Sequence, residues 1–65
     1  MTILSVTAPN AGDFSWPHGL GATPQAAVPK ETSSGLMRLQ PALYDGTNVF
    51  LNASASGVTA FLFLW

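Results

Sequence analysis

The sequence contains no cysteine and very little charge, and both shortages limit what a chain of 65 residues can be. Without cysteine there are no disulfides to stabilise a domain of this size, which buries only about 60% of the surface that its unfolded chain exposes. The one histidine and the three carboxylates are scattered without ligand spacing, so no metal site is expected. Oligomerisation remains as the usual means of stabilising so small a fold.

The shortage of charge excludes some partners and favours others. Charged residues make up 8% of the chain, against roughly 25% in an ordinary soluble domain. Lys30 and Arg38 are the only cations and are too few to neutralise a run of nucleic-acid phosphates. A net charge of −1 gives copies of the chain little electrostatic repulsion. The composition therefore predicts a subunit that is buried in a larger protein assembly.

Long hydrophobic runs are also absent. The sequence from Met1 to Leu4 lacks both the basic flank and the sustained apolar stretch of a secretory signal. The apolar segment 58–65 is eight residues long, whereas a membrane-spanning helix needs about 20. No membrane span is expected, and segment 58–65 has an ordinary length for a β-strand.

Prolines and glycines interrupt the chain so often that few windows are long enough for a helix. Short strands fit between them, at 2–7, 13–16, 25–30, 36–44, 47–53 and 58–64. These predict a single domain over residues 1–65, folded as a six-stranded antiparallel β-sandwich or small barrel. Pro29 and Pro41 cannot donate to a strand ladder, so their strands should bend, bulge or lie at an edge. Asp45-Gly46 predicts a tight type I′ hairpin turn.

The last predicted strand is apolar on both of its faces. Alternation places Val58, Ala60, Leu62 and Leu64 on one face, and most of the other face is aromatic. A strand of this kind needs cover on both sides, one in the core of the subunit and the other against a neighbouring subunit. The alternative is a central strand that its own chain covers on both sides, although 65 residues hardly supply a second layer. The residues predicted at a subunit interface are Val58, Phe61, Phe63 and Trp65.

Segment 16–24 is the densest local pattern. Its Gly19-Leu20-Gly21 is not a dinucleotide-binding loop, because Pro24 stands where that loop needs its third glycine and no helix can follow. The segment is instead expected to be a tight connection between two strands. His18 has no second histidine and no cysteine beside it, so a turn histidine that is hydrogen-bonded to nearby backbone is the main interpretation.

Three stretches together carry a family resemblance: the run from His18 to Pro24, the segment Tyr44-Asp45-Gly46-Thr47-Asn48-Val49-Phe50, and the closing Phe63-Leu64-Trp65. In this spaced pattern the chain resembles the small β-sandwich domains at the tips of bacteriophage tail fibres. Those domains are similar to the H-type lectin fold, a six-stranded antiparallel sandwich that assembles as a trimer. The resemblance covers the chain from His18 onwards.

The resemblance implies a virion component that associates as a homotrimer and contacts capsid or tail proteins of the same particle. A tail-fibre tip follows a long shaft, whereas this sequence begins just before its first strand, so attachment through its own surface is expected. The leading hypothesis is a bacteriophage structural protein that decorates or caps a capsid or tail, or forms a short fibre. No catalytic residue and no cofactor is expected, because the sequence offers neither a base-activated nucleophile nor paired carboxylates.

The alternative hypothesis is a glycan-binding module that recognises a host surface receptor. A sugar stacks its apolar face on an aromatic side chain and hydrogen-bonds to polar neighbours. Packing in the fold is the competing role for the two aromatic candidates, Trp16 and Tyr44. The sugar-contacting residues of the lectin family have no counterparts here, so this hypothesis rests on the fold alone. The candidate glycan contacts are Trp16, His18, Tyr44 and Asp45.

Overall fold

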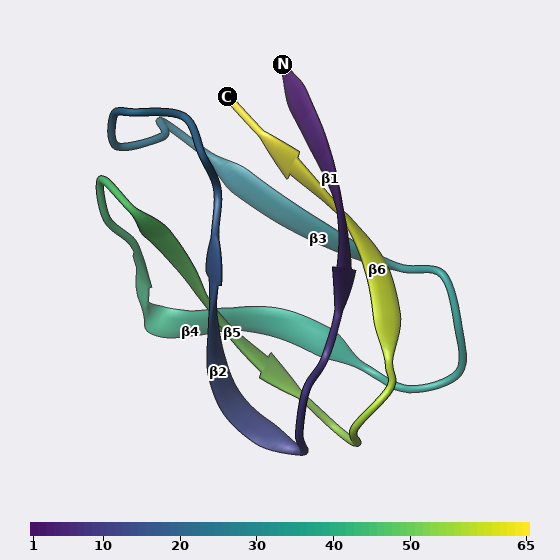
Figure 1. Ribbon diagram of the computed structural model, residues 1–65. Helices are drawn as coiled ribbons and strands as arrows, with labels where there is room; N and C mark the ends of the chain where they lie inside the picture. The colour runs from purple at the N-terminus through teal and green to yellow at the C-terminus, as the bar shows by residue number, and fades with distance from the viewer.

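The computed structural model describes all residues, 1–65, and consists of six β-strands in two sheets without a helix (Figure 1). All pairings are antiparallel. One sheet has the strand order β1-β6-β3 and the other has the order β2-β5-β4, so the two sheets together confirm the expected six-stranded all-β fold. The strands are β1 (Thr2–Thr7), β2 (Gly12–Pro17), β3 (Ala27–Glu31), β4 (Met37–Tyr44), β5 (Asn48–Ala53) and β6 (Thr59–Leu64).

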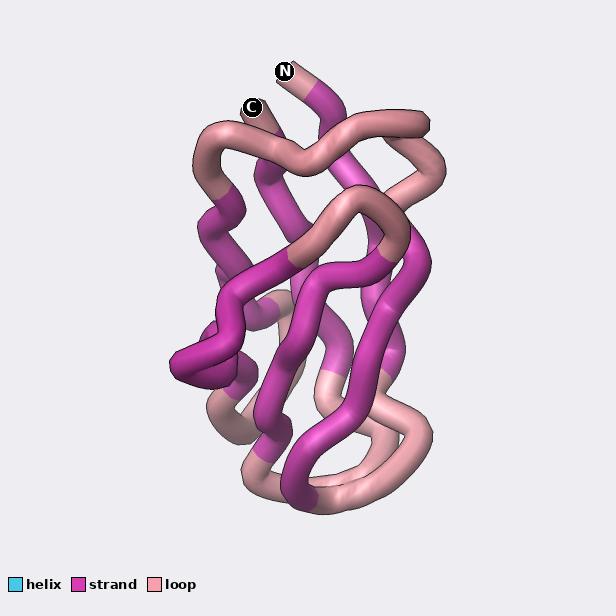
Figure 2. The backbone as a smooth tube through the Cα atoms, turned by 90° about the vertical axis from the view of Figure 1, so that its left-hand side faces the viewer, coloured by secondary structure: helices cyan, strands magenta, loops and turns pink.

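The core lies between the sheets and follows the alternation of side chains along each strand. Twelve hydrophobic residues are buried there, and β5 and β6, the central strands, supply half of them. Figure 2 shows strands and loops only, with most loops gathered at two ends of the sandwich. The buried hydrophobic residues are Val6, Ala8, Phe14, Ala27, Met37, Val49, Leu51, Ala53, Val58, Ala60, Leu62 and Leu64.

The two strands with internal prolines are both edge strands, as expected. Pro29 lies in β3, at one edge of its sheet, and Pro41 lies in β4, at one edge of the other. β4 also bulges, because its pairing with β5 shifts between Leu39 and Tyr44. Within this bulge Leu43 has a φ of 61°, a left-handed conformation that is uncommon outside glycine. Because the bulge interrupts the pairing with β5 around Pro41, the ladder does not need the N–H group that proline lacks.

The turn between β4 and β5 is where expected, but the prediction of a type I′ turn is wrong. That turn needs a positive φ at both Asp45 and Gly46, and neither residue has one. The Asp45 side chain shapes the turn instead, because its Oδ1 accepts hydrogen bonds from the N–H groups of Thr47 (2.8 Å) and Asn48 (2.7 Å). A carboxylate that binds its own turn in this way selects a different geometry for the same hairpin.

Candidate functional site

The outer face of the β1-β6-β3 sheet carries most of the exposed large hydrophobic residues of the molecule. Seven large hydrophobic residues of the protein are exposed, and five of them lie on this face by the alternation of β1, β3 and β6 and their continuations. Scattered apolar residues on a surface are ordinary, whereas a contiguous group marks an interaction site. We call this surface the apolar face and define it by Met1, Ile3, Val28, Phe61, Phe63 and Trp65.

The strand register makes these side chains neighbours. Phe63 in β6 pairs with Ile3 in β1 on one side and with Val28 in β3 on the other, so three apolar side chains cross the sheet in one row. Ile3 is 52% exposed and Val28 is 50% exposed. Directly opposite pairs on one face of a sheet have Cβ atoms about 5 Å apart, so their side chains are in contact range. The row is therefore a continuous apolar strip whose two outer members are about half exposed.

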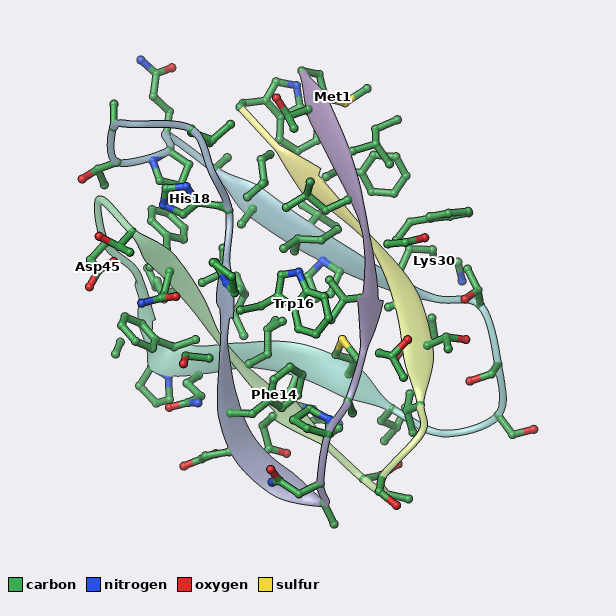
Figure 3. The ribbon with its side chains drawn as sticks, in the orientation of Figure 1. Met1, Phe14, Trp16, His18, Lys30 and Asp45 are labelled. Carbon is green, nitrogen blue, oxygen red and sulfur yellow. The ribbon has the colours of Figure 1, made fainter.

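A second row crosses the same face one step further along β6. Phe61, which is 46% exposed, pairs with Ser5 on β1 and with Lys30 on β3. Lys30 is the only charged side chain on this face, and it lies on β3, an edge strand of the sheet. Figure 3 shows both Lys30 and Met1 at the periphery of the molecule. The centre of the apolar face thus carries no charge to desolvate when another protein covers it.

Of the predicted interface residues, Phe61 and Trp65 are exposed, and Phe63 is half-buried on the apolar face. The prediction that Val58 lies at the interface is wrong, because this side chain is only 3% exposed and belongs to the core. Val58 precedes β6 with the same alternation as Ala60 and Leu62, which both point between the sheets. It also lies against Gly35, where a Cβ atom would come within 2.7 Å of the valine Cγ2 atom.

His18 is a buried residue that holds two loops together. It is 3% exposed, and its Nδ1 accepts a hydrogen bond from the Leu20 main-chain N–H (3.1 Å). Because Nδ1 is an acceptor, the proton of the neutral ring resides on Nε2, which donates to the Asp45 main-chain oxygen at 2.8 Å. Both ring nitrogens are thus used by the backbone, which is the role that the sequence favoured. No ring nitrogen is left for a ligand.

The other candidate glycan contacts lie around this histidine. Trp16 and Tyr44 both pair with Val49, on opposite sides of β5, and both are half-buried against the core. Figure 3 shows Trp16 between the two sheets and Asp45 at the turn beside His18. The Tyr44 hydroxyl donates to the Gln25 main-chain oxygen (3.1 Å). The fold brings the four residues to one region, but the aromatic rings serve packing there.

The two carboxylates with perturbed pKa values are both bound to main-chain N–H groups. The N–H groups of Asn48 and Thr47 lower the pKa of Asp45, since they stabilise its charged form. The Met37 N–H, which donates to Glu31 Oε2 at 3.0 Å, lowers the pKa of Glu31 in the same way. Neither shift is the raised carboxyl pKa of a general acid. Both groups act as caps for backbone.

Several kinds of chemical site are absent from the structure. No three side chains among histidine, cysteine, aspartate and glutamate come together as metal ligands would. The surface has no pocket that would enclose a small molecule. The chain forms no helix, and hence none that is long and apolar enough to cross a membrane. The apolar face is the feature that remains to be explained.

Met1, Ile3 and Val28 are the residues of the apolar face that sequence reasoning missed. The alternation of the segment Thr2–Thr7 carried the signal for Ile3, because Leu4 and Val6 share one face and Ile3 stands with Ser5 on the other. The sequence alone does not say which face is inside, since both carry large aliphatic residues. Only the pairing with Phe63 places Ile3 and Val28 beside the aromatic strand.

Comparisons with protein-family models, with curated protein sequences and with solved structures find no match to this chain. The functional assignment therefore rests on the residues and geometry described above.

Proposed function

We propose that this protein is a structural subunit of a larger assembly and that its apolar face is the surface through which it associates. The observation that carries this proposal is the uncharged row of Ile3, Phe63 and Val28, which crosses all three strands and whose outer members, Ile3 and Val28, are about half exposed. A soluble monomer rarely leaves such a continuous patch uncovered. Covering it removes apolar area from water without desolvating a charge.

The size of the chain supports a need for partners. Its accessible surface is 3634 Å², and a standard interface takes about 800 Å² from each partner, so one such contact covers about a fifth of the molecule. Only 14 of the 65 residues are buried within the chain itself. A second layer over the β1-β6-β3 sheet would give this small core the cover that the chain does not supply.

The assembly that we propose is a bacteriophage virion. Supporting it are the resemblance of the chain to tail-fibre-tip domains and the six-stranded antiparallel sandwich that this resemblance implies. In this proposal the apolar face mediates a homotrimer, and the loops at the ends of the sandwich contact a capsid or tail protein of the particle. The role is passive, since subunits of this kind stabilise or extend a surface and carry out no reaction.

Light scattering on a size-exclusion column tests the association through the apolar face. Phe61→Lys places a charge at the centre of the face, and we expect it to reduce the mass of the assembly to a third, because each homotrimer comes apart. Ser15→Lys is the control, because Ser15 is exposed on the other sheet and the substitution adds the same charge. Assembly that survives Phe61→Lys unchanged would refute the role of this face.

Mass spectrometry of purified particles of the encoding phage tests the proposed location. We expect the chain among the virion proteins, in a number of copies that is a multiple of three. Particles that contain their other structural proteins but lack this chain would contradict the virion role, whatever its state of association.

A further inference from the structure

The edge of β1 that faces away from β6 carries unused hydrogen-bonding groups. The Ala8 N–H donates to the Val58 main-chain oxygen (2.9 Å), at the next position of the β1–β6 register. Hydrogen-bonded residues alternate along an antiparallel ladder, so the even-numbered residues of β1 bond to β6. The N–H and C=O groups of the odd-numbered residues point to the open edge, namely those of Ile3, Ser5 and Thr7.

The edges of β3 and β4 are protected. The two strands are in contact at one side of the sandwich, where the Met37 N–H donates to Glu31 Oε2 (3.0 Å). The Tyr44 hydroxyl donates to the Gln25 main-chain oxygen just before β3. Each strand also contains a proline, and β4 bulges. These are devices by which proteins prevent an edge from pairing with another chain.

The edge of β2 is protected as well. The His18 N–H bonds to the Thr47 main-chain oxygen (3.1 Å), so the odd-numbered residues of β2 point to its open edge. Among them, Pro17 has no N–H, and the Asp13 main-chain oxygen accepts a hydrogen bond from Asn10 Nδ2 (3.3 Å). The Asp13 carboxylate adds a charge at the same edge.

β1 has none of these devices. Its six residues, Thr2–Thr7, include no proline, glycine or charged side chain, and its pairing with β6 has no bulge. In Figure 1 β1 pairs with β6 on one side, while β2, its neighbour on the other, belongs to the second sheet. A regular, uncharged edge is a template for strand addition.

From this contrast we infer that β1 pairs edge to edge, antiparallel, with β1 of a second copy of this chain. Side chains of the two copies stay on matching faces only if odd-numbered residues lie opposite odd-numbered residues. The register with Ser5 opposite the partner's Ser5 meets this condition. It also places Ile3 opposite the partner's Thr7, and each such pair exchanges two hydrogen bonds. This register uses every free group of the edge.

Side-chain contacts favour the second copy as occupant. On the inner side, the half-buried Leu4 lies opposite the partner's Val6, which extends the core across the junction. On the outer side, the two apolar faces join into one strip on the same side of a six-stranded sheet. No charged side chain lies on β1, so the two copies meet without like-charge repulsion.

The edge contact is distinct from the contact through the apolar face and stands without it. The edge contact alone gives a dimer. Together with a trimer through the apolar face it gives a hexamer. Loss of the edge halves the assembled mass, whereas loss of the face leaves the dimer. The two proposals can therefore fail separately.

Substitution at Ser5 tests the inference by light scattering. Ser5→Pro removes an N–H that points to the open edge and leaves the β1–β6 ladder intact, so we expect half the assembled mass of the wild type. Thr7→Pro removes another N–H of the open edge without adding a charge to the apolar face, and should have the same effect. Ser15→Pro is the matched control, because the N–H of Ser15 also points to an open edge, that of β2.

Amide hydrogen exchange gives a second readout that does not depend on any variant. The amides of Ile3, Ser5 and Thr7 should exchange at least about tenfold more slowly as concentration rises through the dimer range. Rapid exchange of all three at every concentration overturns the inference, as does an assembled mass that neither Ser5→Pro nor Thr7→Pro lowers. A loss of mass that the Ser15→Pro control shares equally also overturns it.

Discussion

Phe61 and Leu62 are adjacent residues in β6 that face opposite ways, so truncating each to alanine tests the orientation of the whole strand. Leu62 is fully buried between the sheets, and removing a buried leucine side chain costs about 2–5 kcal/mol. A domain of 65 residues has a stability of about 3–10 kcal/mol at 0.05–0.15 kcal/mol per residue. Leu62→Ala should therefore remove about a fifth or more of the stability of the monomer.

Phe61→Ala should behave differently. Since Phe61 is 46% exposed, its truncation loses only about half of the roughly 1.5–3 kcal/mol that full burial of the ring gives, or about 1 kcal/mol. Its larger effect should be on assembly. Covering the exposed part of the ring removes about 70–110 Å² from water, which is worth about 2–3 kcal/mol per contact. The dissociation constant should thus rise by about 30- to 150-fold.

Urea unfolding measures the free energy of unfolding of the monomer, when it is followed by tryptophan fluorescence at a concentration where the chain does not associate. Trp16 packs against the core and reports its loss. Sedimentation at higher concentration measures the dissociation constant of the assembly. If Phe61→Ala costs the monomer as much as Leu62→Ala, then Phe61 is buried by its own chain and the apolar face does not exist. If it leaves association unchanged, the face takes no part in assembly.

Three further predictions concern the monomer and are read from thermal or urea unfolding. His18→Ala should cost about 2–4 kcal/mol, because it removes a buried ring and its two hydrogen bonds to backbone; an unchanged stability would show that the histidine does not hold the loops. Gly35→Ala should cost about 1–3 kcal/mol more than Gly57→Ala, since both have positive φ but only Gly35 would place a Cβ atom within 3 Å of neighbours; equal costs would contradict the close packing. The lowered pKa values of Asp45 and Glu31 mean that their stabilising effect is complete above their ordinary values and is lost as pH falls below about 4; a melting temperature that does not fall between pH 6 and pH 3 would contradict these caps.

The strands were predictable because the residues that interrupt them act locally. Every connection between successive strands contains a proline or a glycine, and the two internal prolines mark edge strands because a missing N–H is tolerated only there. Alternation alone separated Phe61 from Leu62, which the structure places on opposite faces. These features follow from backbone sterics and from the period of two along a strand.

The features that were not predictable depend on pairing between distant segments. The Asp45-Gly46 turn was assigned the wrong type because the Asp45 side chain binds two N–H groups of the turn, which composition does not reveal. The place of Ile3 and Val28 beside Phe63 depends on the register of three strands. The tie from His18 to Asp45 spans 27 residues and joins loops whose approach only the complete fold determines.

The most direct test of the central claim, that the apolar face is a surface of assembly, is the mass of the wild-type protein in solution by sedimentation equilibrium. From about 1 to about 100 µM we expect a mass that rises to a defined multiple of 6.8 kDa. A folded protein that remains at 6.8 kDa over this range, with Phe61 and Ile3 open to solvent, would contradict the claim.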